Sequence, residues 1–132
     1  MASRLWVAAI CLVAACATVR SGEPANELAY SCDDLVVIGR IAVLSEESLP
    51  DAAPFPGWQS RWELEVRIKR VVRGVETRPA VRATSVSHGQ LREDLDFLTV
   101  LSPRDDGSFV LAEAAAFNPP AGPRPRLAER CT

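Results

Sequence analysis

The chain has 132 residues, a formal net charge of −2 and a single histidine, and 24% of its residues are charged. Acidic and basic residues are interspersed, and no basic block of the kind that binds nucleic acid is present, so no nucleic-acid partner is expected. One histidine and two cysteines that are expected to be oxidised are too few for a zinc centre, so no metal or cofactor is expected.

The first predicted segment is a signal peptide at residues 1–17. Arg4 supplies a positive start, residues 5–15 form an uncharged apolar run, and small residues follow before the chain turns polar. This run is shorter than the about 20 apolar residues that span a bilayer. The pattern therefore predicts an exported protein.

Two processing sites compete at the end of the run. Ala15, Cys16 and Ala17 fit the small-x-small pattern of an ordinary signal peptidase. Residues 13–16, "VAAC", resemble a bacterial lipobox, in which Cys16 would carry the lipid. Residues 18–29 are expected to be a disordered tether. The protein is thus expected to be periplasmic or secreted, or to be an outer or cytoplasmic membrane lipoprotein held only by the lipid on Cys16.

Residues 30–132 are predicted to form one domain that begins with a strand. Residues 33–45 are rich in Val and Ile, and Gly39 within them predicts a bend or bulge. Residues 46–60 contain three prolines close together, which exclude a helix or a central strand and predict a loop.

The clearest strand lies at residues 61–74. Apolar and charged residues alternate over eight positions, which predicts a half-buried strand. The expected core residues are Trp62, Leu64, Val66 and Ile68, and the expected solvent-facing residues are Glu63, Glu65, Arg67 and Lys69. The neighbouring Val71 and Val72 break this alternation and predict a bulge after Ile68, and Gly74 ends the strand.

Weaker strands are predicted at residues 81–86, 96–102 and 109–114, and a proline-rich extended tail follows. Asp106 followed by Gly107 predicts a hairpin between the last two strands. No helix is expected. Five short strands favour an all-β fold, a small five-stranded antiparallel Greek-key barrel of the oligonucleotide/oligosaccharide-binding (OB) type, with a β-sandwich as the alternative.

Two cysteines, Cys32 and Cys131, belong to the predicted domain whichever processing site is used. Two cysteines in an exported chain favour one disulfide. A bridge between them would close nearly the whole domain into a loop.

Three stretches, "YSCDDLVVIGRIAVLSE", "WELEVRIKRVVRG" and "DFLTVLSPRDDGSFVLAEAAAF", resemble in order and spacing the netrin-like module, which includes the N-terminal domain of the tissue inhibitors of metalloproteinases. The resemblance implies a five-stranded barrel and a bond between Cys32 and Cys131. Those inhibitors act through the amine and carbonyl of an N-terminal cysteine. This chain has no second cysteine beside Cys32 and no partner for Cys16, so the resemblance supports the scaffold and not the inhibitory edge.

The single histidine is the main catalytic candidate. His88 lies beside Ser85 and Ser87, and acidic residues follow at Glu93, Asp94 and Asp96. A serine hydrolase needs these groups on separate, preorganised elements, so the segment is interpreted as a surface turn. No catalytic residue is assigned, and the chain is not expected to be an enzyme.

Aromatic residues provide the binding hypothesis. Phe55 and Trp58 in the proline-rich loop either contact a partner or cap the barrel, whereas Trp62 is interpreted as core. The predicted function is an exported, non-catalytic module that binds a protein or polymer in the cell envelope or extracellular space. The alternative is an inhibitor of proteases, as in the metalloproteinase inhibitors.

Overall fold

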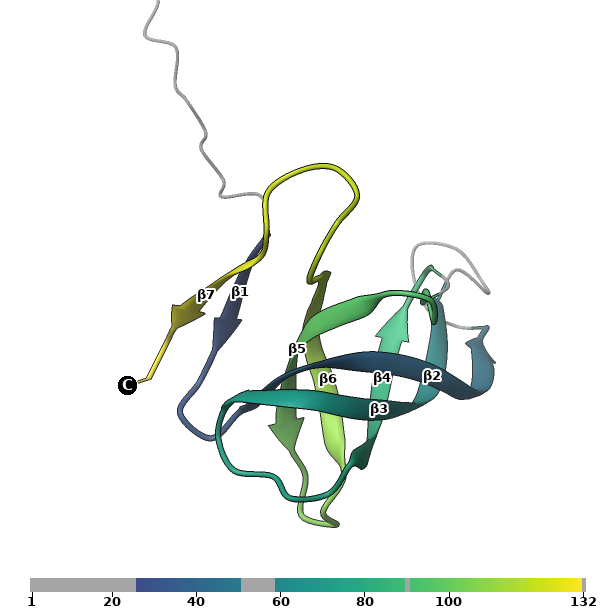
Figure 1. Cartoon of the computed structure of the whole chain (residues 1–132). Coiled ribbons are helices and arrows are strands. Elements are labelled where there is room, and N and C mark those ends of the chain that lie inside the picture. The colour runs from purple at the N-terminus through teal and green to yellow at the C-terminus, as the bar shows by residue number, and fades with distance from the viewer. Residues whose placement is uncertain (1–25, 51–58, 90, 132) are drawn as a thin grey trace, which may run out of the picture.

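The computed structural model describes residues 26–50, 59–89 and 91–131. These residues form seven strands and no helix (Figure 1): β1 (Glu27–Tyr30), β2 (Leu35–Leu49), β3 (Gln59–Arg73), β4 (Ala80–Ser87), β5 (Asp96–Pro103), β6 (Phe109–Ala116) and β7 (Arg126–Glu129). Within the described ranges, no helix of the length and apolarity needed to cross a membrane occurs.

Five of the strands close into a barrel in the order β2-β3-β4-β6-β5, which confirms the predicted all-β barrel of the OB-like class. One pairing differs from the antiparallel expectation, because β4 and β6 run parallel, with Ala83 opposite Phe109 and Thr84 opposite Val110. The reason is geometric. An odd number of strands cannot alternate in direction all the way around a closed ring, so at least one neighbouring pair must be parallel.

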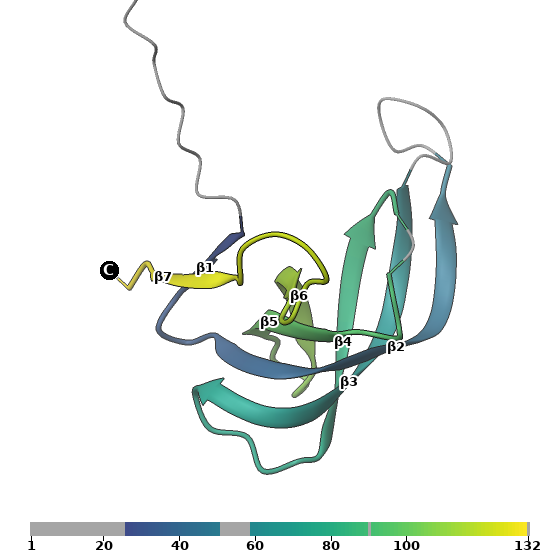
Figure 2. The same ribbon diagram turned by 45° about the horizontal axis from the view of Figure 1, so that its top comes forward.

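Bulges allow the two long strands to bend around the barrel (Figure 2). The pairing of β2 with β3 skips Leu44 on β2 and Lys69 and Val72 on β3, which confirms the predicted bulge after Ile68. Gly39 marks the closest approach of the two strands, because a Cβ atom there would collide with the carbonyl oxygen of Arg67. Only glycine allows this contact, so the predicted bend at Gly39 is also confirmed.

The interior of the barrel is one apolar core, and the alternating residues of β3 supply much of it. Trp62, Leu64 and Val66 are buried, and Ile68 packs against them. The charged residues of β3 face outward, as predicted. Neighbouring strands complete the core with Leu35, Val37, Ile41, Val81, Ala83, Leu101, Phe109 and Leu111.

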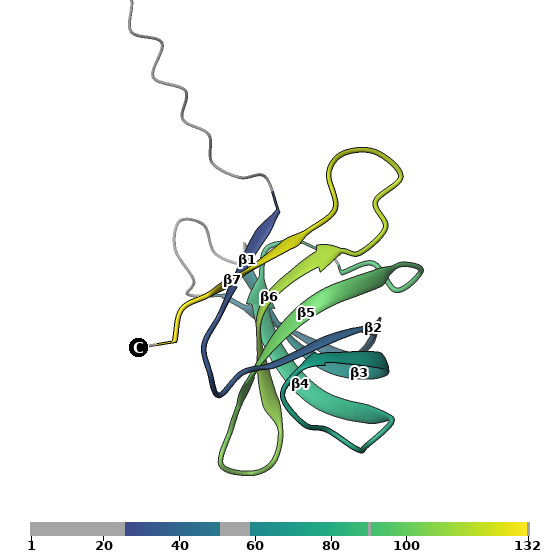
Figure 3. The ribbon, with the colours of Figure 1, turned by 60° about the vertical axis from the view of Figure 1, so that its left-hand side comes forward.

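A second core lies outside the barrel, where β1 and β7 form a parallel two-stranded ribbon beside it (Figure 3). Leu28 and Tyr30 of β1 pack against the outward side chains of β2 and β5, which are Val36, Ile38, Leu98 and Val100. The prediction of a tether over residues 18–29 is therefore wrong at its end, because residues 27–29 belong to β1 and Leu28 is only 3% exposed.

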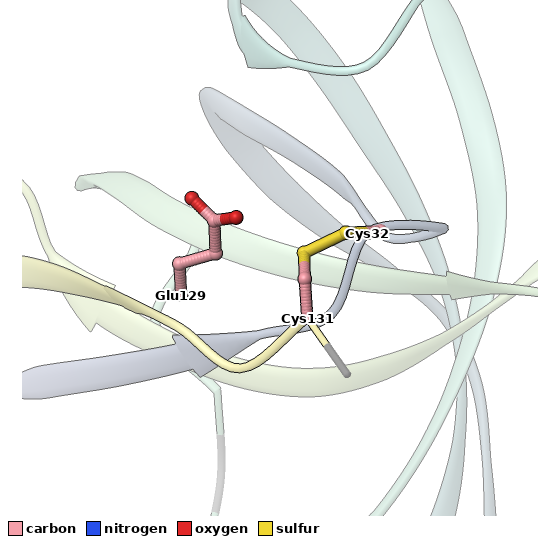
Figure 4. A group of neighbouring side chains, drawn as sticks. All are labelled: Cys32, Glu129 and Cys131. Carbon is pink, nitrogen blue, oxygen red and sulfur yellow. A yellow bond between two sulfur atoms is a disulfide. The ribbon is translucent and has the colours of Figure 1, made fainter.

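The predicted disulfide between Cys32 and Cys131 is present, with Cα atoms 5.1 Å apart and a sequence separation of 99 (Figure 4). Cys32 lies two residues after the end of β1 and Cys131 two residues after the end of β7, so the bond joins the ends of the ribbon. The proline-rich tail reaches Cys32 because β7 pairs with β1, a pairing that the sequence analysis did not predict.

Candidate binding surface

The residues predicted to bind a partner or a lipid, Phe55, Trp58 and Cys16, lie outside the described residues. Trp62, which was interpreted as core, is 5% exposed, and its indole N–H has no acceptor among the described residues. The described residues that could contact a partner are those on the outer surface of the barrel.

The outer side of β3 and β4 is the side on which barrels of this class bind ligands. Strand pairing sets Glu63 opposite Thr84 and Glu65 opposite Arg82, and Thr84 also lies opposite Val110 of β6. Because side chains alternate between the two faces, Arg82, Thr84 and Val86 point outward together. We define the β3–β4 face as Glu63, Glu65, Arg82, Thr84, Val86, Arg104 and Val110.

Two exposed valines lie next to Thr84 on this face. Val110 lies opposite Thr84 on β6 and is 39% exposed, and Val86 lies two residues further along β4 and is 52% exposed, although valine is normally buried. Arg104 donates from Nη1 to the Thr84 hydroxyl at 3.2 Å, which anchors its guanidinium on this face. Arginine is enriched in protein interfaces, so exposed apolar side chains with an anchored arginine on one face suit a docking surface.

One end of the face opens into a shallow cavity of about 260 Å³. Its lining comes from β3, from β4 and the turn before it, and from the β5–β6 hairpin: Glu65, Arg78, Ala80, Val81, Arg82, Asp106, Gly107 and Ser108. The hairpin confirms the turn predicted from Asp106 and Gly107, since Gly107 has a φ of 81° and donates its N–H to the Arg104 carbonyl.

Arg78 joins the turn before β4 to the hairpin. Its Nε and Nη2 donate to the two carboxylate oxygens of Glu76 at 2.8 Å, and Nη1 donates to the Gly107 carbonyl at 3.3 Å. Its guanidinium carbon also lies 5.9 Å from the centre of the Phe109 ring. These hydrogen bonds from Arg78 lower the pKa of Glu76 to about 2, so the pair stays charged and holds the wall of the cavity.

Arg82 is the cation in this cavity that remains available. Its cross-strand neighbour Glu65 accepts from Arg67 Nε at 2.9 Å, and Arg82 itself has no side-chain hydrogen bond or ion pair to any described residue. Opposite it in the lining, Asp106 accepts from the hydroxyl and the amide of Ser108, and these bonds lower its pKa. The lining of the cavity thus contains both a guanidinium without a described partner and an ionised carboxylate.

Several of the residues considered for hydrolysis make separate contacts in the structure. Ser87 donates its hydroxyl to the Gly89 carbonyl at 3.1 Å, and His88 is exposed just after β4. The three acids serve separate contacts: Glu93 accepts from the Val43 amide, Asp94 pairs with Arg92, and Asp96 pairs with both Arg40 and Lys69. This arrangement supports the interpretation of the segment as a surface turn.

Sequence reasoning missed the residues that make this surface. The signal available for it was the run "VRATSV", in which Arg82, Thr84 and Val86 share one side of a strand. The fold defines the class of the protein as a small disulfide-closed barrel of the OB-like type. No protein-family model, curated protein or solved structure matches the chain. The resemblance to the netrin-like module stays a prediction.

Proposed function

We propose that this chain is an exported, non-catalytic binding module that docks a protein partner on the β3–β4 face. The observation that carries the proposal is the exposure of Val86 and Val110 beside the anchored Arg104. Arginine is among the residues that contribute most binding energy in typical complexes, and the buried core of an interface is more apolar than its rim.

The partner would present an apolar side chain to the two valines and a carboxylate to Arg82. Arginine binds carboxylates through two parallel hydrogen bonds, and Arg82 has no described partner that would compete. Phe55 and Trp58 belong to the segment that connects β2 to β3, and we propose that they add aromatic contacts to the same partner. The predicted signal peptide supports a partner in the cell envelope or extracellular space.

Site-specific photo-crosslinking in cells that export the full chain tests this proposal. A photoreactive residue at Val86 should give a crosslinked adduct, and the same residue at Arg126, which is exposed on β7 in the ribbon outside the barrel, should not. Arg82→Glu and Val110→Asp should remove the adduct, whereas the control Arg92→Glu should keep it. Equal adducts from positions 86 and 126, or an adduct that survives Val110→Asp, would contradict the proposal.

Inhibition of a metalloproteinase is the alternative proposal, although the netrin-like resemblance supports only the scaffold and not the inhibitory edge. Inhibition through the amine of the processed N-terminus would not depend on the residues of the β3–β4 face. Processed protein assayed against a panel of metalloproteinases distinguishes the two proposals. Inhibition that persists in Arg82→Glu and Val110→Asp and is lost when the terminal amine is blocked would favour the inhibitor.

A further inference from the structure

Three potential metal ligands converge where the ends of β1 and β7 meet. The sulfur atoms of Cys32 and Cys131 and a carboxylate oxygen of Glu129 all lie within 4.8 Å of one another (Figure 4). Glu129 and Cys131 are two residues apart on extended chain, which places both side chains on one side of it. The sequence alone predicts no metal site, because Cys32 and Cys131 are expected to be oxidised and no local pattern places Glu129 beside them.

Contacts other than the disulfide hold these residues together. The Arg126 amide donates to the Asn26 carbonyl at 2.9 Å, and the Arg130 amide donates to the Tyr30 carbonyl at 2.8 Å. Leu28 and Leu127 pack in the second core between the ribbon and the barrel. We therefore expect the cysteines to remain neighbours after the bond between them is broken.

We propose that the reduced chain binds one Zn²⁺ through Cys32, Cys131 and Glu129, so that the disulfide and the metal are alternative states of one site. Zinc takes thiolate sulfurs at about 2.3 Å and carboxylate oxygens at about 2.0–2.2 Å in tetrahedral geometry. Two such sulfurs are about 3.8 Å apart, a separation that side-chain rotation can supply with the Cα atoms 5.1 Å apart. The fourth position would hold water.

The surroundings suit a metal bound in this way. A cavity of about 200 Å³ adjoins the three ligands and is also lined by Tyr30, Asp34 and Arg73. The Tyr30 hydroxyl donates to Glu129 Oε2 at 3.1 Å, which orients the carboxylate and leaves Oε1 to bind the metal. Two thiolates and a carboxylate leave one excess negative charge around Zn²⁺, and the Arg73 guanidinium beside Tyr30 offsets it.

The exchange between the two states needs a dithiol reductant. The dithiol passes two electrons and two protons to the protein, its own sulfurs join, and the Cys32–Cys131 bond breaks to give two thiols. Zinc binding then releases these two protons to solvent as the thiolates form. A disulfide oxidant reverses the sequence and expels the metal. The metal would thus close the same 99-residue loop in a reducing environment that the disulfide closes in an oxidising one.

Cobalt titration of the full chain tests this site. The background carries Cys11→Ser and Cys16→Ser, so that Cys32 and Cys131 are the remaining thiols. After reduction and removal of the reductant without oxygen, one Co²⁺ per chain should bind. A thiolate charge-transfer band and tetrahedral visible bands should appear, and Zn²⁺ should remove both. The oxidised chain should show neither band.

Glu129→Gln tests the role of Glu129 as a metal ligand separately from its structural role, because the glutamine amide oxygen can still accept the hydrogen bond from Tyr30. It should weaken Co²⁺ binding by roughly tenfold or more, whereas the control Glu27→Gln, at the start of β1, should not. Unchanged affinity in Glu129→Gln, or equal binding by the oxidised chain, would overturn the proposal. If reduction unfolds the chain, adding Zn²⁺ should restore the near-ultraviolet circular dichroism of the parent but not that of Cys32→Ser. A parent whose signal is not restored would also overturn the proposal.

Discussion

At the residue scale, neighbouring positions on β3 differ completely in environment. Val66 is fully buried in the barrel core, whereas the next side chain, Arg67, is 69% exposed and contacts the half-buried Glu65. Val66→Ala removes two buried methyl groups and leaves a small cavity, so we expect a loss of about 1–3 kcal/mol in the free energy of unfolding.

The matched change Arg67→Ala should cost no more than about 0.5 kcal/mol, because it removes only an exposed ion pair. Urea unfolding of the two variants measures both values. A larger loss for Arg67→Ala would mean that the two faces of β3 are assigned the wrong way round.

Glu76 gives a prediction for acid stability. Hydrogen bonds from Arg78 lower its pKa to about 2 in the folded protein, below the value near 4.3 of a free glutamate. A lowered carboxylate pKa adds stability that is complete above the unfolded pKa and is lost as the pH falls from about 4.3 toward 2. Because the Arg78 side chain is 50% exposed, solvent screening reduces the contribution of this pair to stability.

Glu76→Gln should therefore lower the stability of the protein at pH 7. The difference in stability between this variant and the parent should become smaller as the pH falls to 2. Thermal unfolding across this pH range measures the difference, and Glu63→Gln on the outer side of β3 serves as the control. A difference that stays constant with pH would show that the Glu76–Arg78 pair does not contribute in this way.

At the element scale, the close approach of the paired strands β2 and β3 at Gly39 depends on a missing side chain. A Cβ atom on Gly39 would collide with the Arg67 carbonyl oxygen and lie 3.3 Å from the Ile68 Cα. Gly39→Ala must push the two backbones apart and should cost about 1–3 kcal/mol. Gly89→Ala is the control, since a Cβ atom there has nothing within 4 Å. Chemical denaturation should give a lower free energy of unfolding for Gly39→Ala than for Gly89→Ala. Equal values would mean that the backbones of β2 and β3 do not restrict the side chain at position 39.

At the scale of the whole molecule, the disulfide ties together the two ends of the described domain. Closing a loop of this length restricts the unfolded chain, so we expect Cys32→Ser to lower the free energy of unfolding by about 2–5 kcal/mol. The measurement requires a metal chelator, because the reduced site is proposed to bind zinc. Cys11→Ser and Cys16→Ser should leave the stability unchanged, and a similar loss in those variants would argue against the Cys32–Cys131 bond as the main constraint.

Local patterns in the sequence predicted the five strands of the barrel and the inward face of β3, but not β1 and β7. The alternation from Trp62 to Ile68 predicts which side of β3 is buried, because side chains of a strand point to opposite faces at every second residue. Gly39 and the Asp106–Gly107 pair predict a bend and a hairpin, since each feature depends on the conformation of a few adjacent residues. The bond between Cys32 and Cys131 was also predictable, because few cysteines were available.

Only the tertiary structure decided which distant segments meet. The β1–β7 ribbon brings Glu129 to Cys32, and the β4–β6 pairing sets Val110 beside Thr84. Short-range periodicity contains no information about either contact. The run "LVVI" in β2 predicts a strand, but whether both of its faces are buried depends on the ribbon that packs outside the barrel. The candidate binding face and the proposed metal site therefore arise from pairings between residues far apart in the chain.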